Sequence, residues 1–145
     1  MAELLQRQVR EPAPDSLMIP EVVLPELLYQ AAAEFPERPA IIFLKNRCSY
    51  RRLQRLVLKT AAGLARLGFG RGDRLAILLP NCPQTVIVYY AALHLGGIVV
   101  MINPLAAPRE ILDQIRRVGA RLVVVLDHLA PKIEEVRPQL PLEAV

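Results

Sequence analysis

The stretch from Arg74 to Pro104, RLAILLPNCPQTVIVYYAALHLGGIVVMINP, decides the fold, because no Asp, Glu, Lys or Arg follows Arg74 until Arg109. A run this apolar has the composition of a membrane span. Residues that break helices interrupt it, however, at Pro80, Pro83, Gly96-Gly97 and Pro104. The pieces between them are too short to cross a bilayer as one helix. We therefore predict a buried strand–helix–strand unit and no transmembrane span.

Strands and helices alternate along the rest of the chain as well. Apolar periodicity, prolines and glycines predict helices over residues 24–35, 51–67, 83–95, 108–118 and 131–137, and strands over residues 40–44, 74–79, 98–102 and 121–126. A turn after the first strand leads into a brief extended piece. Short connections between alternating elements favour parallel strands, and continuous apolar runs favour cover on both faces. The fold class is therefore α/β, a doubly wound, mainly parallel sheet with helices on both faces.

The composition of the chain fits one folded domain. Of the 145 residues, 53% are hydrophobic and only 5% aromatic, so the apolar content rests on Leu, Val, Ile and Ala, which is typical of a layered α/β protein. Residues 1–20 contain three prolines and mixed charge and predict a loose leader. No apolar run precedes those charges, so we expect no signal peptide. Residues 21–145 make up the α/β portion.

Three closely spaced glycines, Gly68, Gly70 and Gly72, have the composition of a loop that cradles phosphate. In a dinucleotide-binding fold such a loop follows a strand and opens a helix. Here the glycines follow the helix predicted over residues 51–67 and lead into the strand predicted from residue 74. Their order is reversed, so we predict a helix stop and a tight turn, and we do not expect a dinucleotide-dependent oxidoreductase.

Positive charge is concentrated in one block of the sequence, residues 45–74, which holds nine Lys or Arg and one acid, Asp73. Arg51, Arg55 and Lys59 recur every four residues and form a basic stripe on one helix face. A solvated helix face is the favoured interpretation. The stripe could also steer the phosphates of ATP or coenzyme A. No aromatic-rich groove accompanies it, so we expect no nucleic-acid partner.

The residue types that carry catalysis or hold metals are scattered. The thiols of Cys48 and Cys82 form no CxxC pair and indicate a reducing compartment, which places the chain in the cytoplasm. His94 and His128 lack metal-ligand spacing and are interpreted as structural or surface residues. Ser16 lies in no nucleophile elbow.

Ser49 also lies outside any such elbow, so an esterase triad has no support. The carboxylate pairs Glu110/Asp113 and Glu134/Glu135 lie on predicted helices beside basic residues. We interpret both pairs as solvated surface.

Polar residues follow the predicted parallel strands, where ligands gather in doubly wound sheets. These are Asn81, Asn103 and the pair Asp127-His128. The amides of Asn81 and Asn103 could bind a ligand or cap the helices that follow, and capping is favoured.

Three segments together resemble the N-terminal part of the adenylate-forming enzymes, which include acyl-CoA synthetases, luciferases and peptide-synthetase adenylation domains. The segments are LPELLYQAAAEFPERPAIIF (24–43), SYRRLQRL (49–56) and GFGRGDRLAILLPNCPQTVIVYYAALHLGGIVVMINPLAAPREI (68–111). The chain is most similar to fatty-acid–CoA ligases. Arg52 and Ala106-Ala107 depart from the residues common in that group, and these departures bear more on the acyl substrate than on the fold.

The resemblance implies a two-step reaction: a carboxylate attacks the α-phosphorus of Mg·ATP to give an acyl-adenylate, and coenzyme A then displaces AMP to give a thioester. In this family the reacting groups come from a Ser/Thr/Gly-rich phosphate loop with its lysine, a Thr-Glu pair, a ribose-binding Asp and a mobile C-terminal domain. None of these motifs occurs between Met1 and Val145. No catalytic, cofactor-binding or metal residue is therefore assigned to this chain.

We accordingly expect a truncated N-terminal portion of such a ligase. By itself it should be inactive and hold no tightly bound ATP, Mg²⁺ or coenzyme A; its partners would be the remainder of the enzyme and, through it, a fatty acid, ATP and coenzyme A. An unpaired sheet edge could also support self-association. The alternative is a stand-alone, non-catalytic α/β module that binds another protein.

Overall fold

The computed structural model describes residues 21–145, so the predicted leader over residues 1–20, with Ser16, lies outside the described residues. The helices are α2 (Leu24–Glu34), α3 (Tyr50–Arg66), α4 (Pro83–His94), α5 (Pro108–Val118) and α6 (Ala130–Val136), with short 3-10 helices η1 (Asp127–Leu129) and η2 (Arg137–Gln139). The strands are β1 (Pro39–Phe43), β2 (Asn46–Ser49), β3 (Arg74–Leu78), β4 (Ile98–Met101) and β5 (Leu122–Val125). Each element predicted from the sequence is present.

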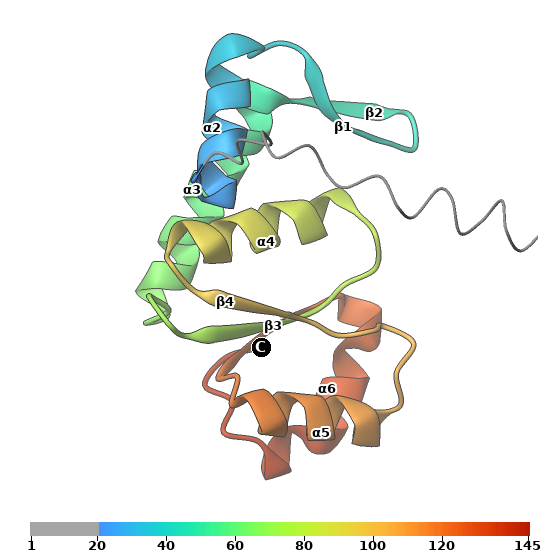
Figure 1. Cartoon of the computed structure of the whole chain (residues 1–145). Helices are drawn as coiled ribbons and strands as arrows, with labels where there is room; N and C mark the ends of the chain where they lie inside the picture. The colour runs from blue at the N-terminus through green and yellow to red at the C-terminus, as the bar shows by residue number, and fades with distance from the viewer. Residues whose placement is uncertain (1–20) are drawn as a thin grey trace, which may run out of the picture.

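Three of the strands form a parallel sheet in the order β4-β3-β5, with helices packed above and below it (Figure 1). The register pairs Leu75 of the central strand with Val99 on one side and with Leu122 on the other. The two crossovers run through α4 and through α5. The prediction of a wound parallel sheet is confirmed, because short connections through a helix can only return the chain to a parallel strand.

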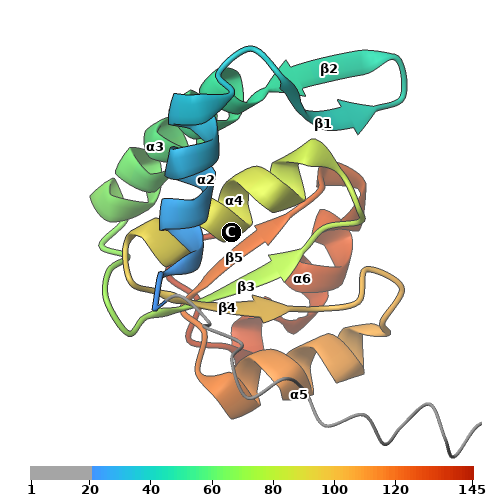
Figure 2. The same cartoon turned by 45° about the horizontal axis from the view of Figure 1, so that its top comes forward.

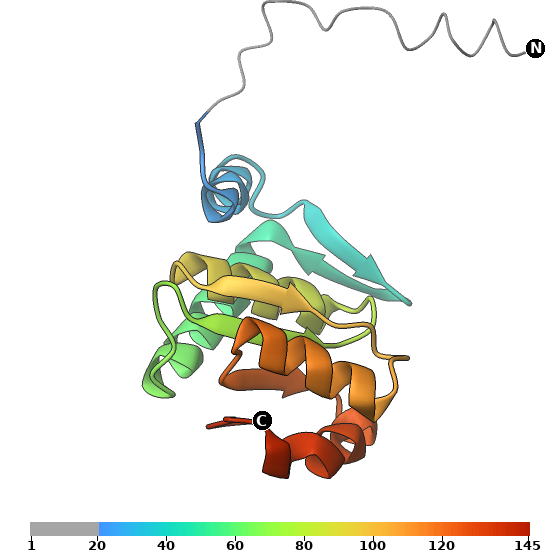
Figure 3. The same ribbon diagram turned by 60° about the horizontal axis from the view of Figure 1, so that its bottom comes forward.

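The sheet separates two apolar clusters. Alternate residues of β3 point to opposite faces, so Leu75 and Ile77 pack with α3 and α4, whereas Ala76 and Leu78 pack with α5 and α6. All four β3 residues have no exposed surface. Figure 3 shows the same layers from another side, with the sheet between the two sets of helices. Cover on both faces explains why these strands read as uninterrupted apolar runs.

The first two strands form a separate antiparallel hairpin, which lies beyond the helices α2 and α3 (Figure 2). Its tip residue Leu44 has a positive φ of 54° and leaves 82% of its surface exposed. Ser49 ends the hairpin and begins α3, where its Oγ accepts a hydrogen bond from the Arg52 backbone N–H at 3.4 Å. Ser49 is thus a helix cap, which agrees with the absence of a nucleophile elbow.

The two edges of the parallel sheet differ. Beside β5, the backbone of Ala144 forms a parallel bridge with Leu122, and its carbonyl accepts from the Val123 N–H at 3.1 Å. The run that ends at Val145 therefore begins a further parallel strand, as expected from its composition. Within residues 21–145, β4 pairs on one side only, and Ile98 and Met101 are each 49% exposed.

Candidate functional site

The carboxyl ends of β3, β4 and β5 lie at one edge of the sheet, because the three strands are parallel. This is the edge where ligands bind in doubly wound proteins. The loops that meet there begin at Leu79, at Ile102 and at Leu126, and they contain the polar residues singled out in the sequence. What those residues do in the structure differs from loop to loop.

The loop between β3 and α4 is organised by Thr85. Its hydroxyl donates to the carbonyl of Pro80, and Cys82 Sγ lies 3.3 Å from the same oxygen, so the thiol is the donor to it. The prediction that Asn81 caps the helix is wrong. Pro83 sets the first turn of α4, which makes Cys82 the N-cap and leaves Asn81 one residue too early.

The loop between β4 and α5 is an Asx turn. Asn103 Oδ1 accepts from the Leu105 N–H at 2.9 Å, so this residue does not cap α5 either, and the second capping prediction is wrong. Pro108 starts that helix and makes Ala107 the N-cap. Glu110 takes over the capping, since its Oε2 accepts from the Ala107 N–H at 3.2 Å. Glu110 is exposed, as predicted, and it also fixes the start of the helix.

Lys132 closes this edge of the sheet from α6. Its Nζ donates to the carbonyls of Pro104, at 3.0 Å, and of Ala106, at 2.9 Å. The contact spans 28 and 26 residues of sequence, and no local pattern predicts it. His128 and Asp127 lie nearby in η1 with their side chains exposed. The loop after β4 is therefore held by a buried ammonium stem and two backbone acceptors.

A pocket of about 370 Å³ opens beneath the hairpin, between the hairpin, α3 and the first turn of α4. In Figure 2 the hairpin lies above this end of α4. The pocket is lined by apolar side chains and by five polar ones, together with the first residue of α4: Ile41, Phe43, Leu56, Ile87, Asn46, Arg47, Cys48, Arg52, Gln84 and Pro83. Sequence reasoning missed this pocket, although Arg47 and Arg52 belong to the basic block it identified.

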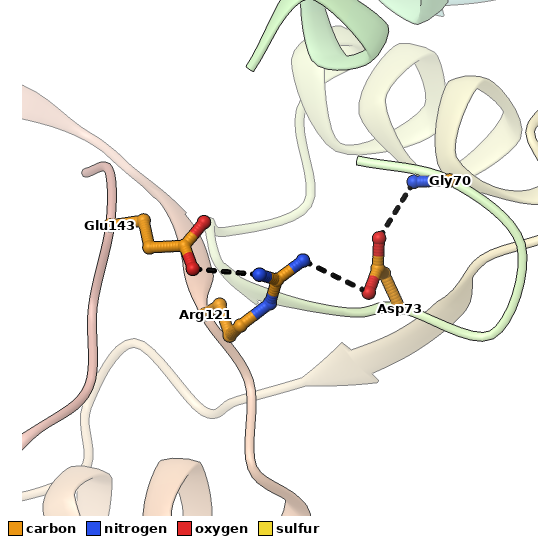
Figure 4. A network of polar contacts seen from close by, with 4 residues as sticks. All are labelled: Gly70, Asp73, Arg121 and Glu143. Carbon is orange, nitrogen blue, oxygen red and sulfur yellow. Dashed lines mark hydrogen bonds and ion pairs between the residues drawn. The ribbon is translucent and has the colours of Figure 1, made fainter. Parts of the chain in front are cut away.

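The three-glycine corner lies at the opposite edge of the sheet, and its N–H groups are already used. Gly68 N–H donates to Ala65, and Gly72 N–H donates to Gly96, each to a backbone carbonyl at 3.0 Å. Gly70 N–H donates to Asp73 Oδ2 at 2.8 Å (Figure 4). Gly68 and Gly72 have φ values of 79° and 81°. The glycines therefore turn the chain, as predicted, and do not present a cradle for phosphate.

Arg121 joins the glycine corner to the end of the chain. Its guanidinium contacts Asp73 Oδ1 at 3.2 Å and Glu143 Oε1 at 2.7 Å (Figure 4). The negative charge of Glu143, and secondly that of Asp73, raises the pKa of Arg121 above its usual value. The guanidinium is solvent-exposed, so this network orders the amino ends of β3 and β5 more than it adds stability.

The basic stripe on α3 is solvent-exposed, in agreement with its interpretation as a solvated face. Arg51 forms an ion pair with Glu37 at 3.0 Å. Arg55 and Lys59 extend along the same face. Steering of nucleotide phosphates by this stripe stays a prediction.

A second hollow, of about 610 Å³, lies between α2 and the end of α4. There the Tyr29 hydroxyl and His94 Nδ1 share a hydrogen bond of 2.7 Å, and the rings meet edge to face. Burial raises the pKa of Tyr29 above its usual value of 10.0. His94 is exposed, as expected for a surface histidine.

Neither a metal centre nor a membrane helix is found in the described part of the chain. Within residues 21–145, no three His, Cys, Asp or Glu side chains come together in a way that could hold a metal ion. No helix among these residues combines the length and the apolar character needed to cross a bilayer. Cys48 and Cys82 are free thiols, both half-buried.

Comparison with known families decides what this fold belongs to. The AMP-binding enzyme family matches residues 28–145, nearly the whole described chain. The chain belongs to the AMP-binding enzyme family. The resemblance noted in the sequence is therefore confirmed, and so is the α/β fold class.

Individual members of the AMP-binding enzyme family agree with this assignment. A long-chain-fatty-acid–CoA ligase of Bacillus subtilis is 42% identical over 119 residues, which cover 82% of this chain and 21% of the relative. A 4-coumarate–CoA ligase of Oryza sativa is 31% identical over 87% of this chain and 22% of its own length. A fatty acyl-CoA synthetase structure from Mycobacterium tuberculosis superposes with a TM-score of 0.80 and 28% identity, covering 84% of this chain and 26% of that one.

The chain therefore spans about a fifth of the length of the curated AMP-binding relatives it matches. The Ser/Thr/Gly-rich phosphate loop expected of this family lies outside these 145 residues.

Proposed function

We propose that this chain forms the first part of the adenylate-forming domain of an ATP-dependent acyl-CoA ligase that acts on fatty acids. The observation that carries the proposal is the 42% identity to a long-chain-fatty-acid–CoA ligase over 82% of the chain. The family match over residues 28–145 supports the ligase chemistry. In the whole enzyme a fatty acid, ATP with Mg²⁺ and coenzyme A would be the reactants, and the cytoplasm would be the location.

The described residues do not fit the role of holding nucleotide or metal. The N–H groups of the glycine corner are bonded within the chain, and the residues of 21–145 bring together no acidic cluster for Mg²⁺. The proposed contribution of this chain is a rigid layer: a parallel sheet whose carboxyl edge is fixed by Thr85, Asn103 and Lys132. The groups that stabilise charge during adenylation would come from the rest of the enzyme.

This proposal predicts that the 145-residue chain by itself catalyses no fatty-acid-dependent exchange between ATP and pyrophosphate. A chimera tests the positive half. The matching stretch of the B. subtilis long-chain-fatty-acid–CoA ligase is replaced by the corresponding residues of this chain, and the exchange assay is repeated. A chimera that carries Ile77→Asp, which places a charge at a fully buried position, serves as the inactive control.

Exchange activity in the chimera, and none in the isolated chain, is the expected result. Exchange by the isolated chain would overturn the predicted inactivity. A folded chimera without exchange, while the parent B. subtilis enzyme remains active, would overturn the ligase assignment of this segment.

A stand-alone protein-binding module is the second candidate, and the unpaired side of β4 favours it. Ile98 and Met101 leave apolar surface beside free strand edge groups within residues 21–145. If self-association uses this edge, Met101→Lys will shift the chain toward monomer in analytical ultracentrifugation. An equal mass distribution for both proteins would exclude this edge as the contact.

A further inference from the structure

We propose that the pocket beneath the hairpin binds an amphipathic anion, an alkyl chain that ends in a carboxylate. The inference goes beyond the proposed ligase activity, because it concerns only residues of this chain and needs neither ATP nor coenzyme A. It rests on the shape, the apolar lining and the charge of one pocket.

The lining of the pocket is apolar at its base and comes from three elements. Ile41 and Phe43 belong to β1, Leu56 to α3 and Ile87 to α4. The volume of about 370 Å³ lies within the range of about 300–1,000 Å³ that small-molecule sites occupy. An alkyl chain would remove this apolar surface from water, which is the main source of affinity for such ligands.

The polar part of the lining is positively charged and contains no acid. Arg47 on β2 and Arg52 on α3 both line the pocket, and in the described part of the chain neither forms an ion pair. Arg51 next to them differs, because Glu37 neutralises it at 3.0 Å. Two guanidinium groups beside an apolar base match a carboxylate joined to an alkyl chain.

The beginning of α4 adds to this positive field. Pro83 and Gln84, the first two residues of the helix, line the pocket. The first turn of α4 contains no acidic residue, and the side chain of its N-cap, Cys82, makes no capping hydrogen bond. The positive end of the helix dipole is therefore not compensated locally, which favours an anion at this position.

The free thiol of Cys48 makes the pocket directly observable. Cys48 lines it and is half-buried, whereas Cys82 is not among the lining residues. In a Cys82→Ser background, the rate at which a maleimide labels Cys48 reports occupancy of the pocket alone. The probe is sodium dodecanoate below its micelle concentration, and no nucleotide is added.

We expect dodecanoate to slow the labelling of Cys48 in a saturable manner. Arg47→Ala and Arg52→Ala should each weaken the apparent affinity about three- to tenfold, since each removes a partly exposed charged hydrogen bond. Arg55→Ala, on the same helix but outside the pocket, should leave the affinity unchanged. Circular dichroism checks that each variant is folded.

The competing amphiphiles distinguish charge recognition from greasiness. Dodecanol and dodecyltrimethylammonium should protect Cys48 at least tenfold less well than dodecanoate. Equal protection by dodecanol, an equal effect of Arg55→Ala and Arg47→Ala, or unprotected Cys48 at saturating dodecanoate would each overturn the proposal. The readout is binding, so failure here leaves the chimera assay untouched, and failure of that assay leaves this site untouched.

Discussion

Arg121 and Asp73 are 48 positions apart in the chain, yet Nη2 of the first lies 3.2 Å from Oδ1 of the second. Each directly precedes a strand, Arg121 before β5 and Asp73 before β3, so the ion pair joins the amino ends of two neighbouring strands. Asp73 also accepts from Gly70 N–H at 2.8 Å. One carboxylate thus fixes both the glycine corner and the start of β5.

Replacing Arg121 with Gln should lower the urea midpoint slightly and make it less sensitive to salt, because the lost interactions are solvent-exposed ion pairs. The measurement is urea unfolding in low and high NaCl. Arg55→Gln, which removes an exposed charge from the α3 stripe, is the matched control. A larger salt effect in the variant than in the parent would contradict the role assigned to Arg121.

Gly97 has no room for a side chain. A Cβ at this position would lie 2.2 Å from Cζ of Phe69, which is 4% exposed, and 3.1 Å from the carbonyl of Ala92. We expect Gly97→Ala to lower the free energy of unfolding by about 1–3 kcal/mol through overpacking. Urea denaturation followed by circular dichroism measures it.

Gly63→Ala is the control for Gly97→Ala. Gly63 lies within α3, and a Cβ there meets nothing within 4 Å. This substitution should raise the free energy of unfolding by about 0.5–1 kcal/mol, because alanine restricts the unfolded chain and favours the helix. Two alanines that change stability in the same direction would show that the contact with Phe69 is not the cause.

Leu44 holds the tip of the hairpin with a φ of 54°, a conformation that is unfavourable for a residue with a large side chain. Leu44→Asn should raise the free energy of unfolding by about 0.5–1 kcal/mol, since Asn tolerates the left-handed region. Leu105→Asn is the control, because Leu105 is 86% exposed and has no positive φ. Equal changes in the two variants would mean that exposure, not backbone strain, determines the effect.

Tyr29 should make the stability sensitive to alkaline pH. Burial raises the pKa of its hydroxyl in the folded chain above 10.0, so the folded state binds that proton more tightly than the unfolded state does. Its contribution is present below pH 10.0 and is lost as the pH rises through the folded pKa. The loss of stability between pH 9 and pH 11 should be smaller in Tyr29→Phe, as measured by urea unfolding at both values. An unchanged loss would contradict the assignment.

Local features of the sequence predicted most of the elements. The helix α5 was expected over residues 108–118 and is found there, because Pro108 suits the first helical position and Gly119 takes the left-handed conformation that ends a helix. The order of helix, glycines and strand was also enough to predict a turn at Gly68–Gly72. Both inferences depend on neighbours within a few residues.

Features that depend on distant neighbours were not predicted. Nothing local indicates that β1 and β2 pair apart from the parallel sheet, or that residues 41 to 87 come together around one pocket. The capping role of Asn81 and Asn103 failed for a different reason. Pro83 and Pro108 shift each helix start downstream, beyond the reach of either amide.

The strand β3 supplies side chains to both apolar clusters, so neither set of helices owns an independent interior. If α5 and α6 detached, Ala76 and Leu78 would be exposed to water, and the backbone ladder shared with Leu75 and Ile77 would lose its cover. Opening of one side therefore weakens the other, and amide protons in the three strands should exchange together, at a single rate-limiting event, instead of layer by layer.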